Sequence, residues 1–506
     1  MKLKLFILFI FIVNYLPAQN IFQKVIGLGN PGRALSFCVT NDTIVGTCAG
    51  RLFKSDSCGN IIWVKKYLPS SIYKTGKVFS LSNGGYVMLV EMVANGFGSG
   101  DIMVFNMDKD GLIEWIKYFG TDDYESPADM VELPDGDIVI AGQTKTNIHN
   151  GKEVLLMRIN KYGDQFWQRT YGTSSDADKP QKLLKSSFGG FVVAGEMAYM
   201  KNILRTDNNG NVKWSYSYGE GALFDMAENP INGDLFVCGS MRSALKGESN
   251  AFVMRTDSSG NVLWANMIGN DYREIAYTLN CNQDFSSIYL AGEYQADTAL
   301  KADAFVAGIN AADGGLLWAK LYGSSQVEVF YDNIVFRENS LLNIGYSEGF
   351  DTVFQNVYLV KTTLDGSSGC MESGLLPTID STLHLLPDTV VLTLDTVEQW
   401  VSSVCYPPSL INPQQLTLCS TESMDDKEDV AVHIYPNPAE DYLIIDYDLK
   451  KGEVVELFDE TGRSVHFCFK SNQENVRIGT ADLSPGIYLL KIAGKNRLIT
   501  QKIIIR

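Results

Sequence analysis

The chain has 506 residues, 45% of them hydrophobic, which is enough to bury a large core in two or three domains. Its formal net charge of −17 argues against a nucleic-acid partner, because an acidic surface repels phosphate backbones. The nine cysteines are too sparse for a disulfide scaffold. Their pairing cannot be assigned from sequence, although after export a pair such as Cys405 with Cys419 could form.

Residues 1–18 have the pattern of a signal peptide. Lys2 and Lys4 precede an apolar run over residues 5–13, and Ala18 is a small residue suited to cleavage. The run is well short of the roughly 20 residues that a membrane-spanning helix needs. We therefore predict export to the periplasm, with an uncleaved membrane anchor as the alternative.

From residue 19 to residue 370, a unit of about fifty residues repeats, a period expected of propellers and other arrays. Each copy has a turn in which an Asp or Asn starts the bend and a Gly takes the positive φ that closes it. The Trp that follows is expected to bury its ring between neighbouring sheets. Trp63, Trp115, Trp167, Trp214, Trp264 and Trp318 follow Gly59, Gly111, Gly163, Gly210, Gly260 and Gly314 by four residues.

Three short strands precede the turn in each unit, so one unit carries four antiparallel strands, as a propeller blade does. Seven sets of these three strands occur, but only six fourth strands begin at a Trp. We predict that residues 21–27 complete the last blade, with Phe22 in the Trp position, which removes an exposed edge. The alternative is that residues 362–370 do so, with Cys370 in that place.

The turn and its Trp resemble the tryptophan-docked blades of the quinoprotein-like propeller superfamily, and residues 309–323 (INAADGGLLWAKLYG) are the nearest copy. They also resemble repeats of large surface proteins from Bacteroidetes-type bacteria. The resemblance covers residues 21–370 and implies a fold only, because propellers host many unrelated activities. We therefore predict an all-β chain, with a seven-bladed β-propeller of four-stranded blades followed by a small Ig-like β-sandwich.

Residues 371–429 break the repeat. They contain five prolines and several acidic or Ser/Thr-rich patches, which are typical of connecting segments. Residues 388–400 have the composition of a strand or two. We interpret the segment as a partly ordered linker with short strands.

Residues 430–506 alternate short strands with turns rich in Gly or Asp, which predicts a small β-sandwich. Five motif elements occur in order: YPNP, DYLII, LFDETGR, LSPGIYLLKI and a final KIIIR. Together they resemble the type A C-terminal sorting domain of the type IX secretion system. The motif residues are Tyr435, Pro436, Asn437, Pro438, Asp441, Gly462, Arg463, Gly486, Tyr488 and Lys502.

This resemblance implies a route as well as a fold. In that family the outer-membrane translocon recognises the domain, which is usually removed before the protein is attached to anionic lipopolysaccharide. The mature protein would then be secreted or displayed on the outer-membrane surface. The alternative is an ordinary Ig-like domain at the C-terminus.

Few residues suggest chemistry. The four histidines have no metal-ligand spacing. Residues 345–349 match G-x-S-x-G around Ser347, but a nucleophile elbow needs a helix after it, and a strand is expected here. Residues 108–111 hint at a calcium loop, yet a hairpin turn explains their acids without an ion. We therefore predict no cofactor and no metal, with a weakly bound cation as the alternative.

An acidic residue opens the innermost strand in several blades. We expect these acids to ring one mouth of the central channel, where gathered like charges would favour a cation or a basic ligand. Solvated loop acids are the alternative. The residues are Glu125, Asp178, Glu274 and Glu328.

These patterns predict a secreted or cell-surface module for binding or adhesion, with an unknown glycan or protein ligand. The regular repeat carries no recognisable catalytic constellation, and a fold alone does not define an activity. The alternative is an extracellular enzyme, either a hydrolase or a quinoprotein-like dehydrogenase, that uses a propeller face.

Overall fold

The computed structural model describes residues 21–506 with gaps, and this part of the chain is all-β. The gaps are residues 29–33, 41, 49, 68–72, 94–97, 146–150, 174–177, 243–248, 270–271, 296–300, 337–339, 351–355, 376, 381–382, 384, 391, 396–399, 404–408, 411–413, 421–432, 447–453, 459–463, 470–475, 482 and 495–496. The signal-peptide prediction lies outside the described residues. Among the described residues, no helix is long and apolar enough to cross a membrane. The chain divides into two compact units, Met1–Ser423 and Met424–Arg506, which we describe separately.

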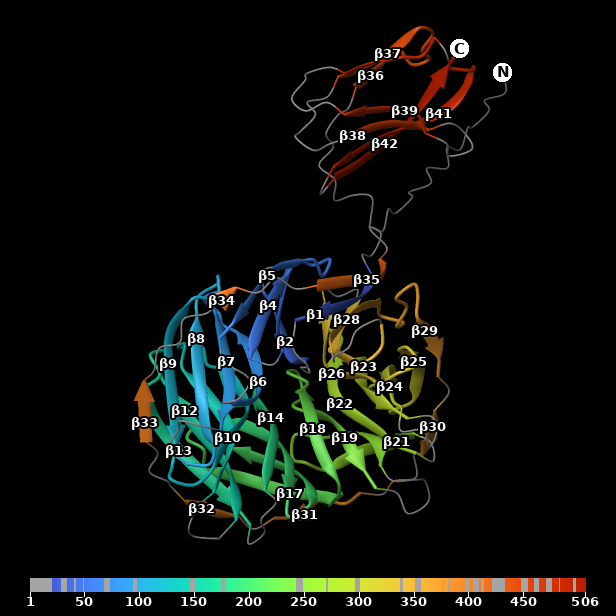
Figure 1. The fold of residues 1–506 in the computed structure, drawn as a ribbon. Coiled ribbons are helices and arrows are strands. Elements are labelled where there is room, and N and C mark those ends of the chain that lie inside the picture. Colours follow the sequence, from blue (N-terminus) through green and yellow to red (C-terminus); the bar gives the residue numbers. More distant parts are fainter. Residues whose placement is uncertain are drawn as a thin grey trace, which may run out of the picture. The chain divides into compact units, whose positions relative to one another are not determined.

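The first unit is a ring of seven sheets, counted over the described residues (Figure 1). From the centre outward, blades one to four contain β2 (Ala34–Thr40), β3 (Thr43–Cys48), β4 (Arg51–Ser55) and β5 (Ile61–Lys66); β6 (Tyr73–Ser80), β7 (Tyr86–Met92), β8 (Asp101–Met107) and β9 (Ile113–Gly120); β10 (Glu125–Glu132), β11 (Ile138–Lys145), β12 (Lys152–Ile159) and β13 (Gln165–Gly172); and β14 (Lys179–Lys185), β15 (Phe191–Met197), β16 (Met200–Thr206) and β17 (Val212–Glu220).

Blades five to seven contain β18 (Ala222–Glu228), β19 (Leu235–Met241), β20 (Asn250–Thr256) and β21 (Val262–Gly269); β22 (Glu274–Cys281), β23 (Ser287–Tyr294), β24 (Asp303–Asn310) and β25 (Leu316–Tyr322); and β26 (Glu328–Phe336), β27 (Ser340–Ser347), β28 (Asn356–Thr363) and β1 (Phe22–Gly27). The predicted seven-bladed β-propeller is confirmed.

Apolar side chains fill the spaces between neighbouring blades. Strand β8 is buried along its whole length, because adjacent sheets cover both of its faces. Seven apolar clusters of the described residues each join two consecutive blades, and one of them brings Phe22 of blade seven against Phe37 and Phe53 of blade one. The core is therefore distributed around the ring rather than concentrated in one layer.

Blade seven joins the two ends of the ring. Strand β1 pairs antiparallel with β28, from Phe22 opposite Lys361 to Ile26 opposite Val357. Of the two segments that the sequence offers for this position, the structure uses the N-terminal one. Phe22 is fully buried, and its ring lies against Gly59 of blade one, where an added Cβ would come within 2.8 Å of the ring.

The segment that we interpreted as a linker is part of the propeller. It adds a fifth, antiparallel outer strand to each blade, so the blades are five-stranded rather than four-stranded. The chain visits blades six, five, four, three, two and one in turn and ends in blade seven (Figure 1). We call residues 372–420 the belt. Its strands are β29 (Glu372–Gly374), β30 (Thr378–Asp380), β31 (Asp388–Thr389), β32 (Thr393–Asp395), β33 (Trp400–Ser403), β34 (Ser409–Leu410) and β35 (Gln414–Ser420).

The belt covers edges that would otherwise be open. Without it, the outer strand of every blade would present unpaired N–H and C=O groups. The belt also places apolar side chains against the clusters between blades: Leu375 and Ile379 between blades five and six, and Leu392 between blades three and four. Its first six strands have only two to four residues, which is too short for the alternating pattern that marks a strand in sequence.

The second unit is a small β-sandwich, as the sequence predicts. One sheet contains β36 (His433–Tyr435), β37 (Tyr442–Asp446) and β40 (Val476–Gly479). The other contains β39 (Ser464–Phe469), β38 (Val454–Phe458), β41 (Gly486–Gly494) and β42 (Arg497–Ile505). Their inner faces share one apolar cluster, which includes Leu443, Leu457 and Ile503.

Candidate functional site

The aromatic anchors of the repeat dock on the turn of the next blade. A Cβ added at Gly111 would lie 3.0 Å from Trp63, and one at Gly163 would lie 3.0 Å from Trp115. The indole N–H of Trp115 also donates a hydrogen bond to the carbonyl of Lys161 in the next blade, at 3.0 Å. Glycine is needed here both for its positive φ and for this close approach. Trp167, Trp264 and Trp318 meet Gly210, Gly314 and Gly366 in the same way.

Tyrosine hydroxyls reinforce this docking. Tyr171 donates a hydrogen bond to the carbonyl of Gly210 at 2.6 Å, and Tyr67 and Tyr218 make the equivalent bonds to Gly111 and Gly260. Blade four departs from the pattern: Tyr216, rather than Trp214, meets Gly260, and Trp214 stacks on Tyr216 with ring centroids 5.1 Å apart. Apart from the Trp214–Tyr216 stack within β17, these contacts join neighbouring blades, so the anchors serve packing.

The four acids that we expected at a channel mouth are buried. Glu125, Asp178, Glu274 and Glu328 are at most 1% exposed, so they present no charge to solvent. Glu125 accepts hydrogen bonds from the backbone N–H of Thr121 (2.6 Å) and from the hydroxyls of Thr121 and Thr144 (2.8 and 2.7 Å). Burial raises the pKa of Glu125 and of Asp178. Glu125, Asp178 and Glu328 fasten the loop that enters the inner strand to their own blade. The four acids do not form a ring of exposed charge.

Ser347 has a structural setting. It is fully buried at the end of β27, and its hydroxyl donates a hydrogen bond to Glu328 at 2.7 Å. Its oxygen accepts the backbone N–H of Gly349 at 3.0 Å. The next element along the chain is strand β28, which is not the helix that follows a nucleophile elbow.

The acidic turn at residues 108–111 is closed by its own side chain. Asp108 accepts hydrogen bonds from the backbone N–H groups of Asp110 (2.9 Å) and Leu112 (2.8 Å). The turn therefore uses the carboxylate without an ion. Among the residues that the structure describes, no group of three or more His, Cys, Asp or Glu side chains is arranged to hold a metal.

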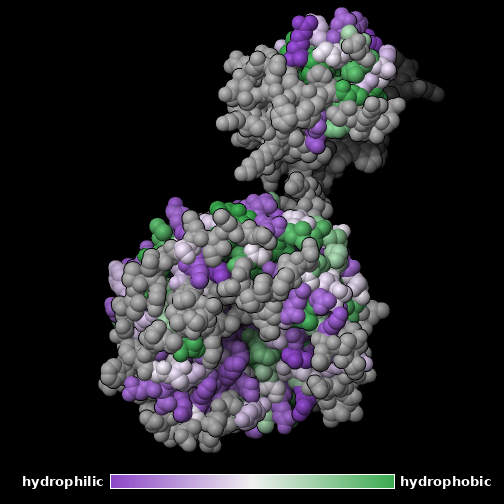
Figure 2. Space-filling view, in the orientation of Figure 1, coloured by the Kyte–Doolittle hydropathy of each residue, from purple (hydrophilic) through white to green (hydrophobic). Residues whose placement is uncertain are grey.

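The inner strands enclose a cavity of about 490 Å³. Its lining residues come from the innermost strands of all seven blades, so the cavity lies on the propeller axis. Figure 2 shows hydrophilic residues beside the hollow near the middle of the propeller. A pocket of this size is within the range of about 300–1,000 Å³ that is typical of small-molecule sites.

One wall of this cavity is aromatic. Phe224, Tyr277 and Tyr331 lie on three consecutive blades, with ring centroids 5.4 and 5.0 Å apart, and all three line the cavity. Tyr331 also stacks on Tyr346 at 5.9 Å. Each of the three is the extra residue of a β-bulge, where the register against the second strand skips one position. A bulge re-aims its side chain, which explains why these rings turn to the axis.

Charged groups line the same cavity. The ammonium group of Lys182 lies 3.0 Å from Asp225 and 3.9 Å from Asp129. The carboxylates that directly follow the bulge residues also bind the neighbouring blade. Asp225 accepts the backbone N–H of Leu279 (2.9 Å), and Asp332 accepts that of Phe37 (3.1 Å). These acids are therefore part of the ring's hydrogen bonding as well as part of the cavity wall.

Burial and neighbouring charges set the pKa values of Asp332 and Lys182. Burial raises the pKa of Asp332 to about 7, the nearby cation of Lys182 lowers it, and the carboxylate of Asp225 raises it. Burial alone would lower the pKa of Lys182, but Asp225 and Asp129 outweigh it, so the pKa of Lys182 is raised. Lys182 therefore stays charged at neutral pH, and the pKa of Asp332 lies close to neutral pH.

A second cavity of about 530 Å³ is formed by blades two to four. Lys77 lines both cavities, and the second one adds Lys152, Lys179, Glu91 and Glu196. Its charges are mixed, and it lacks an aromatic wall like that of the first.

The sequence analysis did not identify the cavity residues, because they match no motif. Aligning the repeats on the second strand of each blade would have found them, because five tripeptides then occupy the same position. These are ADM at 128–130, QKL at 181–183, FDM at 224–226, YTL at 277–279 and YDN at 331–333. The first residue is aromatic only in blades five to seven, and the second is charged in four of the five.

The motif residues of the C-terminal unit gather near its last strand. The amide of Asn437 donates to the carbonyl of Lys502 (3.0 Å) and accepts the N–H of Ile504 (2.9 Å), so YPNP is tied to β42. The hydroxyl of Tyr488 donates to the carbonyl of Ser484 at 2.8 Å. Gly462 and Arg463 lie outside the described residues.

Residues 433–506 match the family model described as the secretion system C-terminal sorting domain. The C-terminal unit is thus the sorting domain of a type IX secretion substrate, and it implies export to the cell surface or the extracellular space.

Several solved structures are similar to the chain. A protein of unknown function from Bacteroides caccae is 15% identical with a TM-score of 0.37, over 57% of this chain and 93% of that one. The Pan2 WD40 domain from Neurospora crassa is 11% identical with a TM-score of 0.44, over 65% and 89%. Hydrazine synthase from Kuenenia stuttgartiensis is 10% identical with a TM-score of 0.45, over 62% and 92%. No curated protein matches the chain.

Proposed function

We propose that this protein is an exported saccharide-binding module whose ligand site is the cavity on the propeller axis. The route begins with the signal peptide at residues 1–18 and passes through the periplasm. The sorting domain then engages the translocon and is removed, and the propeller is released or attached to lipopolysaccharide. The match of residues 433–506 to the sorting-domain family supports the route.

The cavity combines aromatic and charged side chains, and this combination supports the proposal of a saccharide. The apolar C–H face of a sugar ring packs on an aromatic side chain, and its hydroxyls hydrogen-bond to carboxylates, amides and ammonium groups. Tyr277 and Tyr331 supply the first kind of surface, and Lys182, Asp332 and Asn333 supply the second. The pairing of Lys182 with Asp225 and Asp129 limits the net charge of the wall, which suits an uncharged ligand.

The test is a binding panel with matched variants of the full chain. We expect the wild-type protein to bind a subset of an immobilised glycan panel. Tyr277→Ala and Tyr331→Ala should each weaken binding at least tenfold, which corresponds to about 1.4 kcal/mol. Tyr277→Phe keeps the ring and removes only the hydroxyl that bonds to Arg273, so it should bind within a few fold of wild type.

Tyr162→Ala is the control, because Tyr162 is an exposed aromatic residue on a turn of blade three. Absence of binding across the glycan panel would count against the saccharide. Unchanged binding by both Tyr→Ala cavity variants would count against the cavity as the site. Selective capture of peptides instead would favour the protein ligand.

An extracellular hydrolase that acts at the same cavity is the second candidate. The observation that favours it is Asp332, because a carboxyl group with a pKa of about 7 can donate a proton near neutral pH. Incubation with the bound saccharide and chromatography of the products decides between the two. Product formation that Asp332→Asn abolishes while binding persists would establish the enzyme.

A further inference from the structure

The chain enters the belt from blade seven and returns to blade seven at the end of the belt. It leaves blade seven after the turn that follows β28, passes along the other six blades as β29 to β34, and pairs with blade seven as β35. There β35 pairs along the outer side of β1, with Cys419 opposite Gln23. Blade seven therefore contains the N-terminal strand of the ring, the strand β28 that leads toward the belt, and the last belt strand.

Between these ends, each blade holds the belt by only a few bonds. Strands β31 and β34 have two residues each, and each pairs over two positions. Much of the belt surface faces solvent: Leu386 is 83% exposed. Strands that pair with different blades separate one at a time under tension, so no single step has to break more than a few hydrogen bonds.

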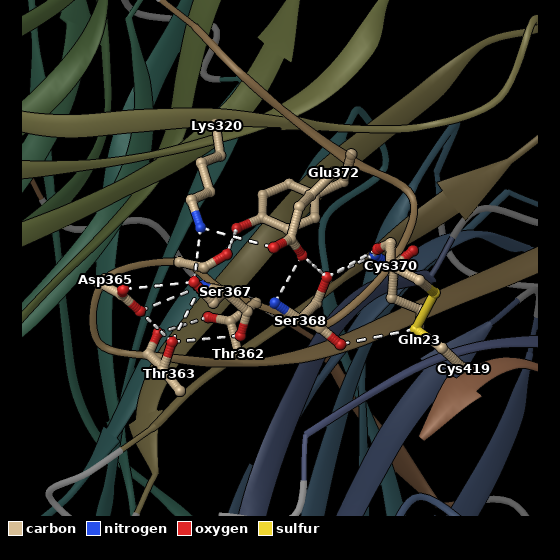
Figure 3. Close-up of polar contacts among 12 residues, drawn as sticks. Gln23, Lys320, Thr362, Thr363, Asp365, Ser367, Ser368, Cys370, Glu372 and Cys419 are labelled. Atoms are coloured by element: carbon tan, nitrogen blue, oxygen red, sulfur yellow. Dashed lines mark hydrogen bonds and ion pairs between the residues drawn. A yellow bond between two sulfur atoms is a disulfide. The ribbon is translucent and has the colours of Figure 1, made fainter. Parts of the chain in front are cut away.

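A disulfide joins the two ends. Cys370 precedes the first belt strand, Cys419 lies in the last one, and their sulfur atoms are bonded (Figure 3). The covalent loop contains every belt strand from β29 to β34 and encircles the ring. The pair that we offered as an example, Cys405 with Cys419, is wrong, because Cys419 bonds to Cys370.

Buried polar groups hold the closure in place (Figure 3). The amide of Gln23, fully buried in β1, donates to the hydroxyl of Ser368 (2.7 Å) and to the carbonyl of Cys370. Glu372 accepts the backbone N–H of Ser368 at 2.6 Å and pairs with Lys320 of blade six at 3.6 Å. The N-terminal strand and the start of the belt thus share one hydrogen-bonded cluster, beside the disulfide.

We propose that the Cys370–Cys419 disulfide is an anchor that keeps the belt on the propeller when the C-terminal sorting domain is pulled. The chain leaves the propeller through β35 and continues to the sorting domain, so tension on that domain reaches β35 first. The disulfide transfers this tension to Cys370 and β28, inside blade seven, and bypasses the short strands of the belt. The proposal does not depend on any ligand of the cavity.

Closing the anchor requires oxidation. The two thiols each lose a proton and together give two electrons to an external disulfide oxidant, which is reduced to two thiols while the new S–S bond forms. Such oxidants act in the periplasm and outside the cell, whereas the cytoplasm keeps thiols reduced. The anchor therefore closes only after the chain has left the cytoplasm.

Single-molecule pulling on the two ends of the full chain tests the proposal. In Cys370→Ser/Cys419→Ser we expect an early release of the belt at a force below that which unfolds the blades. The released length should be about 160 Å, from 49 residues at about 3.3 Å each. The oxidised wild type should show no such early event, and Cys58→Ser, which removes a cysteine outside this disulfide, should match it.

Hydrogen exchange on the folded wild-type protein, with and without a thiol reductant, gives a second readout that does not need the variant to fold. Reduction should raise exchange in the belt strands at least tenfold and leave β8 and β20 unchanged. The proposal is overturned if the belt of the double variant unfolds only together with the blades, or if reduction leaves belt exchange unaltered.

Discussion

Two adjacent residues of the inner strands determine the chemistry of the channel. The extra residue of the bulge, such as Tyr277 or Tyr331, supplies a ring to the cavity, and the residue after it, such as Asp332, binds the neighbouring blade. The same β-bulge thus places one side chain in the cavity and the next in a hydrogen bond to the neighbouring blade. Aromatic residues in blades five to seven and small or polar ones in blades three and four make the cavity one-sided.

The carboxyl group of Asp332 makes stability depend on pH. Its folded pKa of about 7 lies above the unfolded value of about 3.9, so folding favours the protonated form. The stability contributed by this proton is complete below pH 4 and is lost as the pH rises to 7 and above. The groups that act on Asp332 are Lys182, Asp225 and Lys77, and Lys182 keeps two carboxylates when Asp332 is removed.

We therefore expect Asp332→Asn to be more stable than wild type at pH 8, by about 1–2 kcal/mol, and to differ little at pH 4.5. The amide oxygen can still accept the backbone N–H of Phe37. Denaturant unfolding at both pH values measures this, with Asp110→Asn, at an exposed turn residue, as the control for net charge. A variant that is less stable than wild type at pH 8 would contradict the assigned pKa.

The sequence predicts an individual residue where that residue recurs at the same position in successive repeats. The Trp anchors could be identified because each follows its turn Gly at one spacing, and Phe22 because residues 21–27 match the strand at residues 264–269. The burial of Glu125 and Glu328 could not, because a carboxylate at a loop end is normally solvated. Only the structure reveals the hydroxyls of Thr121, Thr144 and Ser347 that satisfy these acids.

At the scale of the element, a turn glycine has a packing role beyond its backbone. In blade four, Gly189 and Gly210 have nearly the same φ, +83° and +81°. A Cβ at Gly189 would meet nothing within 4 Å, whereas one at Gly210 would come within 2.9 Å of the Tyr171 hydroxyl and 3.1 Å of Arg169. Comparing alanine substitutions at Gly189 and Gly210 therefore distinguishes the cost of backbone strain from the cost of a clash at the contact between blades.

We expect Gly189→Ala to reduce the free energy of unfolding by about 1 kcal/mol, from strain at positive φ alone. Gly210→Ala should cost about 2–4 kcal/mol, because it adds the clash at the docking contact. Equilibrium unfolding in urea measures both. Equal losses in the two variants would show that the contact with Tyr171 contributes nothing to stability.

The inner elements were predictable and the belt was not. Four strands per blade could be inferred because each has five to nine residues and ends at a turn with a physical signature. The belt strands of two to four residues are stable because they pair with the outer edges of the blades. Those edges exist only in the assembled ring, so the local sequence does not reveal these strands.

At the scale of the whole molecule, the chain divides into two units. The propeller, with its belt, ends at Ser423, well beyond residue 370 where the repeat stops in the sequence. The sandwich that follows matches a sorting domain and provides the route. We therefore propose that the first unit binds the ligand and that the second unit directs delivery.

Binding of a labelled saccharide from the glycan panel to intact cells tests this division most directly. The full chain, a chain lacking residues 433–506 and Tyr277→Ala are each expressed in a bacterium with a working type IX system, and cells and medium are assayed. We predict that the full chain binds outside the cell. The truncated chain should bind only after the outer membrane is permeabilised, and Tyr277→Ala should reach the surface without binding. Surface binding by the truncated chain, or undiminished binding by Tyr277→Ala, would contradict the account.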